Sequence, residues 1–315
     1  MSGLASSSSP RRILLCGYYG EHNLGDDALL EVLNKQLPQG WQPLITAHDA
    51  GAVQTIVPRG SVVNRRSLKA VLNSIKQVQV VILGGGSLLQ DSTSVRSLIY
   101  YILLIVVAQV RRKPVLLWGQ GLGPLRHAWS RYLVGRVLNG ATSITWRDTA
   151  SMQLAKRIGI KTSMSVAPDP VWTHHMSEHR GGGNIVLCWR PTNLLTASGW
   201  SLLLQSVDQL SKRTGKSVTW LAFHANQDAN LLETLNEKGL VPHTLAMESN
   251  TVVAQNIEHA QTIFKEASLV IAMRLHALIL AIISQCPSAA LSYDPKVEAA
   301  ARTADVPCFG LEQLP

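Results

Sequence analysis

The sequence has few of the features that mark secreted, zinc-binding or membrane-spanning chains. Its 315 residues include only four cysteines, none in a CxxC pair, so neither a disulfide framework nor a zinc site is indicated. The longest apolar run, residues 98–110, is shorter than the roughly 20 residues that cross a bilayer. These absences predict a chain of the reducing cytoplasm without a transmembrane helix.

Signals for nucleotide cofactors, metals and nucleic acid are missing as well. Neither the dinucleotide pattern GxGxxG nor a P-loop Gly-Lys-Ser/Thr occurs, and we expect no cofactor. His174 and His175 are adjacent and point apart in an extended segment, so we expect no bound metal. Aromatic residues make up only 5%, and no RNA-binding or helix-turn-helix signature accompanies the positive net charge. Nucleic acid is therefore not an expected partner.

Acidic residues are almost absent from one long stretch. Between residues 50 and 147 the chain has 13 Lys and Arg against a single acid, Asp91. This part should carry a positive field that attracts a small polyanionic substrate or the headgroups of an anionic membrane. Charge alone does not choose between these partners, so peripheral contact with a membrane stays open.

The sequence does contain a repeated alternation of short apolar runs and helix-length segments. The runs are ILLCGYY, VVILGGG, PVLLWGQG and SITWRD, then NIVLCWRP, VTWLAFH, LVIAMRLH and AALSYDP. Continuous apolar runs are typical of parallel strands that helices cover on both faces. The pattern predicts an α/β protein with two doubly wound, Rossmann-like domains facing a cleft. Ligands of such domains bind at the carboxyl ends of the strands.

The amino-acid composition of two short segments predicts where the domains begin and end. Residues 1–10, MSGLASSSSP, are small and polar, lack the apolar run of a signal peptide and are expected to be a disordered tail. Residues 11–168 form the basic N-terminal domain. Residues 169–183, with a proline and three consecutive glycines, are interpreted as a linker. Residues 184–315 form the C-terminal domain.

Polar residues follow the first strand in the loop GEHNLGDD. A helix is expected from about Asp26, whose side chain can cap its first turn. Gly20 and Gly25 free the backbone beside Asn23 to approach a ligand, and the N–H groups of a helix amino terminus bind anions. Turn glycines with a helix cap would explain the loop equally well.

Three later strands in the first half are also followed by residues that could bind a ligand. Gly85, Gly86 and Ser87 offer backbone amides after a buried strand, and consecutive glycines cost entropy that a simple turn does not require. Gln120 follows the next strand in a glycine-rich loop. Close packing of a helix against the strand would explain the glycines of this loop as well as a ligand would. Arg147 ends a further strand, and its guanidinium would suit a carboxylate or phosphate, unless it forms a local ion pair.

The second half offers a denser set of cations. Arg190 follows its first strand, and SLVIAMRLHALILA places Arg274 and His276 where a buried strand is expected to end. The two share one face if the strand continues through them, although a lone histidine beside a core is more often structural. Lys296 comes 20 residues after His276, so these groups should converge at adjacent strand ends. His224 and Asp228, after another strand, are interpreted as structural.

The chain as a whole resembles the polysaccharide pyruvyl transferase family, of the CsaB type from bacteria that pyruvylate cell-wall glycans. The resemblance is carried, in order, by GYYGEHNLGDDALL at 17–30, GGGSLLQD at 84–91, QGLGP at 120–124, WRD at 146–148, MRLHALI at 273–279 and SYDPKV at 292–297. One departure is Asp27, where the family commonly has glutamate.

The resemblance implies a fold like that of the two-domain glycosyltransferase B type. It implies phosphoenolpyruvate as donor and a sugar as acceptor, carried in some members on a polyprenyl diphosphate at the inner face of the membrane. The acceptor would lie on the N-terminal domain. Family precedent places Arg147, Arg274, His276 and Lys296 at the donor, and Arg190 is a further candidate.

His276 is the candidate acid of this reaction, because imidazole can donate a proton near neutral pH. The base could be Asp26, Asp148 or His276 after its first proton transfer. Two rivals remain: a nucleotide-sugar glycosyltransferase of the same fold, and a non-catalytic module that binds anionic membrane or glycan. The sequence makes no prediction of the oligomeric state.

Overall fold

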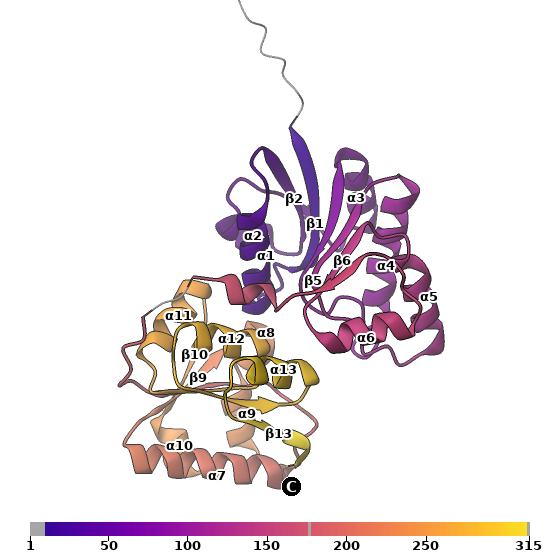
Figure 1. The fold of residues 1–315 in the computed structure, drawn as a ribbon. Helices are drawn as coiled ribbons and strands as arrows, with labels where there is room; N and C mark the ends of the chain where they lie inside the picture. The colour runs from indigo at the N-terminus through magenta and orange to yellow at the C-terminus, as the bar shows by residue number, and fades with distance from the viewer. Residues whose placement is uncertain (1–9, 176–177, 314–315) are drawn as a thin grey trace, which may run out of the picture. The chain divides into compact units, whose positions relative to one another are not determined.

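The computed structural model describes residues 10–175 and 178–313. The predicted tail at 1–10 therefore lies outside the described residues except for Pro10. The chain divides into two compact units (Figure 1). Unit 1 comprises the residues up to Glu21 together with Leu29–Pro170, and unit 2 comprises His22–Ala28 together with the chain from Val171 onward.

Unit 1 is built on a seven-stranded sheet in which every neighbouring pair is parallel, in the order β3-β2-β1-β4-β5-β6-β7. The chain order reverses between β1 and β4, which is where doubly wound sheets bind their ligands. The strands are β1 (Arg11–Tyr19), β2 (Trp41–Ala47), β3 (Ser61–Asn64), β4 (Val80–Gly84), β5 (Val115–Gln120), β6 (Ser143–Trp146) and β7 (Met164–Val166).

Helices connect these strands and supply much of the core. They are α1 (Leu24–Gln36), α2 (Ala50–Ile56), α3 (Leu68–Ser74), η1 (Ile75–Gln77), α4 (Val95–Val110), α5 (Ala128–Leu138) and α6 (Thr149–Arg157). The long apolar run of the sequence is the body of α4, where Leu98, Leu104 and Ile105 have no exposed surface. Ser94 caps α4, since its hydroxyl accepts the N–H of Ser97.

Unit 2 carries a six-stranded parallel sheet in the order β10-β9-β8-β11-β12-β13. Its strands are β8 (Ile185–Cys188), β9 (Val218–Ala222), β10 (Ser249–Val253), β11 (Leu269–Ala272), β12 (Ser288–Ser292) and β13 (Cys308–Gly310). The order reverses between β8 and β11. Four consecutive strands, β9-β8-β11-β12, form the middle of the sheet.

The helical segments of this part of the chain begin with η2 (Pro170–Thr173). They continue with α7 (Ala197–Thr214), α8 (Ala225–Asp228), α9 (Leu231–Glu237), α10 (His243–Glu248), α11 (Ile257–Glu266), α12 (Leu275–Ile283), α13 (Pro295–Thr303) and η3 (Leu311–Gln313). Helix α12 is buried over most of its length, because the sequence LHALILAII is apolar on every face.

All eight apolar runs recognised in the sequence are strands, and all of them pair in parallel. The predicted α/β class with two Rossmann-like sheets is therefore confirmed. Two predicted details are wrong. Helix α1 begins at Leu24, before Asp26, because the Asn23 side chain accepts the N–H of Gly25 and its carbonyl accepts those of Asp26 and Asp27.

The second error concerns the strand that leads to Arg274 and His276. Strand β11 ends at Ala272, Arg274 is the cap residue of α12, and His276 already lies in the first turn of that helix. The two side chains therefore do not alternate along a continuing strand. The run of Leu, Ile and Ala after position 274 favours helix and ends the strand earlier than the apolar pattern suggested.

Two absences apply to the described ranges 10–175 and 178–313. Within them, none of the helices combines the length and the apolarity that crossing a bilayer requires. The same residues include no group of three or more His, Cys, Asp or Glu placed to hold a metal ion.

Candidate functional site

The polar residues of unit 2 gather at one edge of its sheet. Arg190 follows β8, Asp228 follows β9, Arg274 follows β11 and Lys296 follows β12, and these four strands are neighbours in the sheet. Parallel strands present their carboxyl ends at the same edge of the sheet. The cations therefore follow adjacent strand ends, as the sequence predicts. Helices α12 and α13 begin at this edge and add the positive ends of their dipoles.

Arg274 is held by a carboxylate that the sequence analysis interpreted as structural. Its Nε lies 3.0 Å from Asp228 Oδ2, its Nη2 also contacts Asp228 Oδ1, and Nη2 lies 3.0 Å from Gln227 Oε1. The Asp228 side chain has no exposed surface, and Oδ2 also accepts the backbone N–H of His224 at 2.9 Å. This two-point contact fixes the plane of the guanidinium.

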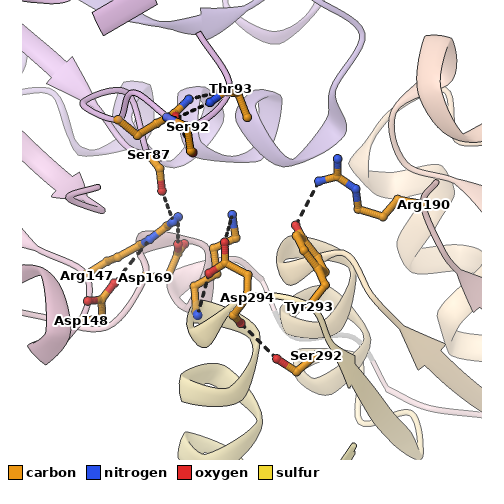
Figure 2. A network of polar contacts seen from close by, with 12 residues as sticks. Ser87, Ser92, Thr93, Arg147, Asp148, Asp169, Arg190, Ser292, Tyr293 and Asp294 are labelled. Atoms are coloured by element: carbon orange, nitrogen blue, oxygen red, sulfur yellow. Dashed lines mark hydrogen bonds and ion pairs between the residues drawn. The ribbon is translucent and has the colours of Figure 1, made fainter. Parts of the chain in front are cut away.

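Two further cations share an aromatic ring. The Arg190 guanidinium lies 4.9 Å from the Tyr293 ring centroid and its Nη1 lies 3.3 Å from the phenol oxygen, as Figure 2 shows. Lys296 Nζ lies 5.8 Å from the same centroid and 3.4 Å from Asp294 Oδ2. Burial raises the pKa of Tyr293, but Lys296, Arg190 and Arg274 outweigh it and bring this pKa below its ordinary value.

His276 lies against the first turn of helix α1. Residues 22–28 belong to unit 2 and join the end of β9, where Leu24 N–H donates to the Phe223 carbonyl at 3.0 Å and Ala225 N–H donates to that of His22 at 3.1 Å. A Cβ on Gly25 would lie 2.1 Å from His276 Nδ1. Only glycine permits this approach, so the imidazole contacts bare backbone.

The two other candidates of this loop lie beside Gly25. Asn23 forms an isolated antiparallel bridge with His224, and its side-chain amide donates to the Asp26 carboxylate. Asp26 itself is 9% exposed. Because residues 22–28 group with unit 2, Asn23, Gly25 and Asp26 belong to the same unit as Arg274 and His276, which their place in the sequence does not indicate.

His224 adds a neutral imidazole to this edge. It is 5% exposed, and neither ring nitrogen has a hydrogen-bond partner in the described part of the chain. Burial, followed by the positive charge of Arg274, lowers the pKa of His224. The ring therefore stays uncharged at neutral pH beside a charged arginine.

Unit 1 places Arg147 at the corresponding edge of its own sheet. Arg147 Nη1 lies 3.3 Å from Asp169 Oδ2, Nη2 donates to Ser87 Oγ at 2.7 Å, and Nε lies 3.9 Å from Asp148 Oδ2 (Figure 2). The arginine side chain is only 4% exposed. The local ion pair, which is the alternative prediction for this arginine, is thus present.

The glycine loops of unit 1 have structural reasons for their glycines. Gly85 and Gly86 have φ of 73° and 75°, a conformation that favours glycine. The buried Gln120 amide holds this turn, since Nε2 donates to the carbonyl of Gly85 at 2.6 Å. Gly20, at φ 67°, lies so close to Asp49 that a Cβ would come within 2.7 Å of its carbonyl oxygen.

One charged cluster of unit 1 escaped the sequence analysis. Arg65, after β3, donates to Glu21 Oε1 at 3.0 Å and to the Tyr101 hydroxyl at 3.1 Å, and lies 4.6 Å from the Tyr18 ring centroid. Arg66 also contacts Glu21, at 3.3 Å. The partners are 36 to 47 positions apart in the chain, so no local pattern connects them.

Comparison with models of protein families identifies the family of this chain. A sequence model described as polysaccharide pyruvyl transferase matches residues 23–295. The chain belongs to the polysaccharide pyruvyl transferase family. The match covers β2 to β12 and includes Arg147, Arg190, Arg274 and His276, whereas β1 and Lys296 lie outside it. No curated protein matches the sequence significantly.

Solved structures similar to this pyruvyl transferase family member include an epimerase, a protein in complex with UDP and glucose, and MurG. The UDP-GlcNAc 2-epimerase from Methanocaldococcus jannaschii has a TM-score of 0.61 at 12% identity, over 96% of this chain and 89% of that one. Anabaena HepE in complex with UDP and glucose gives 0.59 at 12%, over 89% and 80%. Acinetobacter baumannii MurG gives 0.52 at 13%, over 97% and 87%. At these identities the likeness shows the fold alone, which is of the glycosyltransferase B type.

Proposed function

We propose that this member of the family transfers the enolpyruvyl group of phosphoenolpyruvate to two hydroxyls of a saccharide. The product is a pyruvate ketal, and phosphate is released. One observation carries the proposal: Arg190, Arg274, His276 and Lys296 all follow neighbouring strands at the carboxyl edge of the unit 2 sheet. The proposed acceptor is a cell-wall or exopolysaccharide sugar, which in the CsaB-type resemblance can be lipid-linked.

The cations suit a donor with two anionic groups. Phosphoenolpyruvate carries a carboxylate and a phosphate, which planar guanidinium groups bind in two-point contacts. Arg274 is already fixed by Asp228, so its orientation requires little reorganisation when the donor binds. Helix α12 has no side-chain cap at Arg274, so N–H groups of its first turn would supply further donors for the phosphate.

Arg147 has a different part in the proposal. Its side chain is 4% exposed and already contacts Asp169 and Ser87. We therefore assign it to holding the loops at the carboxyl edge of unit 1, where the saccharide would bind, and leave direct donor binding to the three cations of unit 2. The ordered turn at Gly85 and Gly86 would present backbone groups to that acceptor.

The proposed chemistry begins at the methylene carbon of the donor. His276 donates a proton to C3, which leaves an oxocarbenium ion at C2, and a sugar hydroxyl attacks this carbon. The proton of this hydroxyl passes to a base. Phosphate then leaves C2 and takes up the proton of the second hydroxyl, which closes the ketal. Asp26, Asp148 and His276 remain the candidates for the base.

Phosphate release tests this proposal directly. Purified enzyme is incubated with phosphoenolpyruvate and a panel of free and lipid-linked saccharides, and the acceptors are analysed by mass spectrometry. We expect phosphate only with a matching acceptor, together with the mass of a pyruvate ketal. A glycosyltransferase would instead release a nucleotide from a nucleotide sugar, and a non-catalytic module would yield neither product.

Variants of the acid and its neighbour sharpen the test. His276→Ala should reduce turnover by at least about 100-fold and change phosphoenolpyruvate binding only a few fold. Gly25→Ala should displace the imidazole and also lower turnover, because a Cβ would overlap Nδ1. Gly310→Ala is the matched control, since the atoms nearest to its Cβ would belong to the flexible Gln313 side chain, at 3.4 Å or more. Retained turnover in His276→Ala removes this residue from the acid role.

A further inference from the structure

Helix α5 has apolar side chains on both of its faces. Val134, Val137 and Leu138 are buried in the core of unit 1. On the outward face, Trp129 is 44% exposed and Tyr132 is 74% exposed. Of the eight tryptophans in the chain, Trp129 alone belongs to the exposed class. An exposed apolar patch that is rimmed by charged residues marks an interaction surface.

This face is surrounded by positive charge. Residues 111–161 contain ten Lys and Arg and one acid, Asp148. That carboxylate accepts the N–H of Ser151 at the start of α6 and lies 3.9 Å from Arg147, so it is already engaged. The exposed bases are Arg111 and Arg112 after α4, Arg126 before α5, Arg136 on α5, and Lys156, Arg157 and Lys161 on and after α6.

A groove of about 590 Å³ opens beside the aromatic face, between α5 and α6. It is lined by Arg131, Tyr132, Leu154, Arg157, Ile158 and Gly159. Two guanidinium groups and two branched aliphatic side chains therefore border the same space. This combination matches a ligand that joins an anionic group to an apolar chain.

We propose that this surface, comprising Trp129, Tyr132, Arg136 and Arg157, docks unit 1 onto an anionic phospholipid bilayer. Tryptophan and tyrosine are the residues that settle at the level of lipid headgroups, and lysine and arginine are attracted to anionic headgroups. The groove receives a headgroup phosphate. Nucleic acid would use the charges but would leave the apolar lining of the groove without a partner.

The surface adjoins the loops assigned to the acceptor. Helix α5 follows β5, so it begins at the carboxyl edge of the unit 1 sheet, next to α4 (Figure 1). The Asp91 carboxylate in the loop after β4 accepts the N–H groups of Arg126 and His127, at 2.7 and 3.0 Å, and ties that loop to the start of α5. Docking would bring the acceptor loops to the membrane, where a lipid-linked saccharide is found. Only this link between docking and the acceptor rests on the proposed function.

Vesicle binding tests the surface without any catalytic readout, so its outcome is independent of the transfer reaction. The full chain is sedimented with vesicles of phosphatidylcholine and with vesicles of equal parts phosphatidylcholine and phosphatidylglycerol. We expect at least roughly tenfold tighter binding to the anionic vesicles. Brominated lipids should quench tryptophan fluorescence in the wild type and much less in Trp129→Phe.

Variants of surface residues distinguish binding through α5 from binding through the overall positive charge of the protein. The pairs Trp129→Ser/Tyr132→Ser and Arg136→Gln/Arg157→Gln should each weaken binding about tenfold or more. Phe309→Ser and Arg213→Gln, at exposed positions of unit 2, are the matched controls and should bind as the wild type does. Equal binding to both vesicle types, retained binding in both variant pairs, or a preference for duplex DNA or for self-association over vesicles would overturn the proposal.

Discussion

Asp228 carries a buried charge whose partners are the guanidinium of Arg274 and the backbone N–H of His224. Its contacts with Nε and Nη2 of Arg274 leave the guanidinium one orientation. A fixed partner lowers the reorganisation cost when an arginine binds an anion, because the binding geometry exists before the ligand arrives. Asp228 is thus a positioning residue for the proposed donor site.

Replacing this carboxylate by an amide should therefore weaken donor binding in addition to lowering the stability of the fold. In Asp228→Asn one oxygen becomes an NH₂ group that faces the guanidinium donors, and Arg274 loses its fixed orientation. We expect kcat/KM for phosphoenolpyruvate to fall roughly 10- to 100-fold, mainly through KM, and the free energy of unfolding to fall by about 1–3 kcal/mol.

The control for this variant is Asp208→Asn, which removes another buried carboxylate of unit 2, one that contacts Lys212 and Thr244. It should lower stability without changing the KM for phosphoenolpyruvate. If Asp228→Asn lowers stability and leaves that KM unchanged, Asp228 has a structural role only.

His224 predicts a pH dependence of stability. Because burial lowers its pKa in the folded state, the unfolded chain binds a proton more readily below its ordinary pKa near 6.5. The stabilisation from the neutral ring is present above that pH and is lost as the pH falls toward the folded pKa. Melting temperatures measured from pH 7.5 to 5 should fall less in His224→Leu than in the wild type. An equal fall in both proteins would exclude His224 as the source.

The sequence could place the cations of the proposed donor site but not their partners. Arg190, Arg274 and Lys296 follow apolar runs, and parallel strands bring such positions to one edge. The contacts with Asp228 and Tyr293 depend on side-chain packing among residues 46 to 103 positions apart. The neighbour of His276, Gly25, could not be found either, because residues 22–28 join a unit whose remaining residues begin at Val171.

At the scale of elements, burial decides which strands the sequence reveals. The strands recognised as apolar runs are central ones, covered on both faces. Those missed are the interior strand β2, whose apolar residues are interrupted by Gln42 and Pro43, and all four edge strands of the two sheets, β3, β7, β10 and β13, which are three to five residues long and partly exposed. An edge strand has one neighbour and little buried surface, so its sequence carries no continuous apolar signal.

Helix α4 shows that the longest apolar run of the chain belongs to the core. Leu104→Ala, at a residue with no exposed surface, should lower the free energy of unfolding by about 2–5 kcal/mol, because it removes buried methyl groups and leaves a cavity. Ile99→Ala, on the same helix at a residue 41% exposed, should cost less than about 1 kcal/mol. Chemical denaturation measures both values. Similar values would mean that α4 does not pack as the structure shows.

At the scale of the whole molecule, the net charge of +9 is concentrated where acids are nearly absent, between residues 50 and 147. Such a field raises the local concentration of a small polyanion and is screened by salt, with a Debye length of about 10 Å at 0.1 M. We expect KM for phosphoenolpyruvate to rise roughly threefold or more between low and moderate ionic strength, with kcat nearly constant. Matching the ionic strength with chloride and with acetate salts separates screening from competition by the added anion. A KM that does not change with ionic strength would show that the donor is captured only by short-range contacts with Arg190, Arg274 and Lys296.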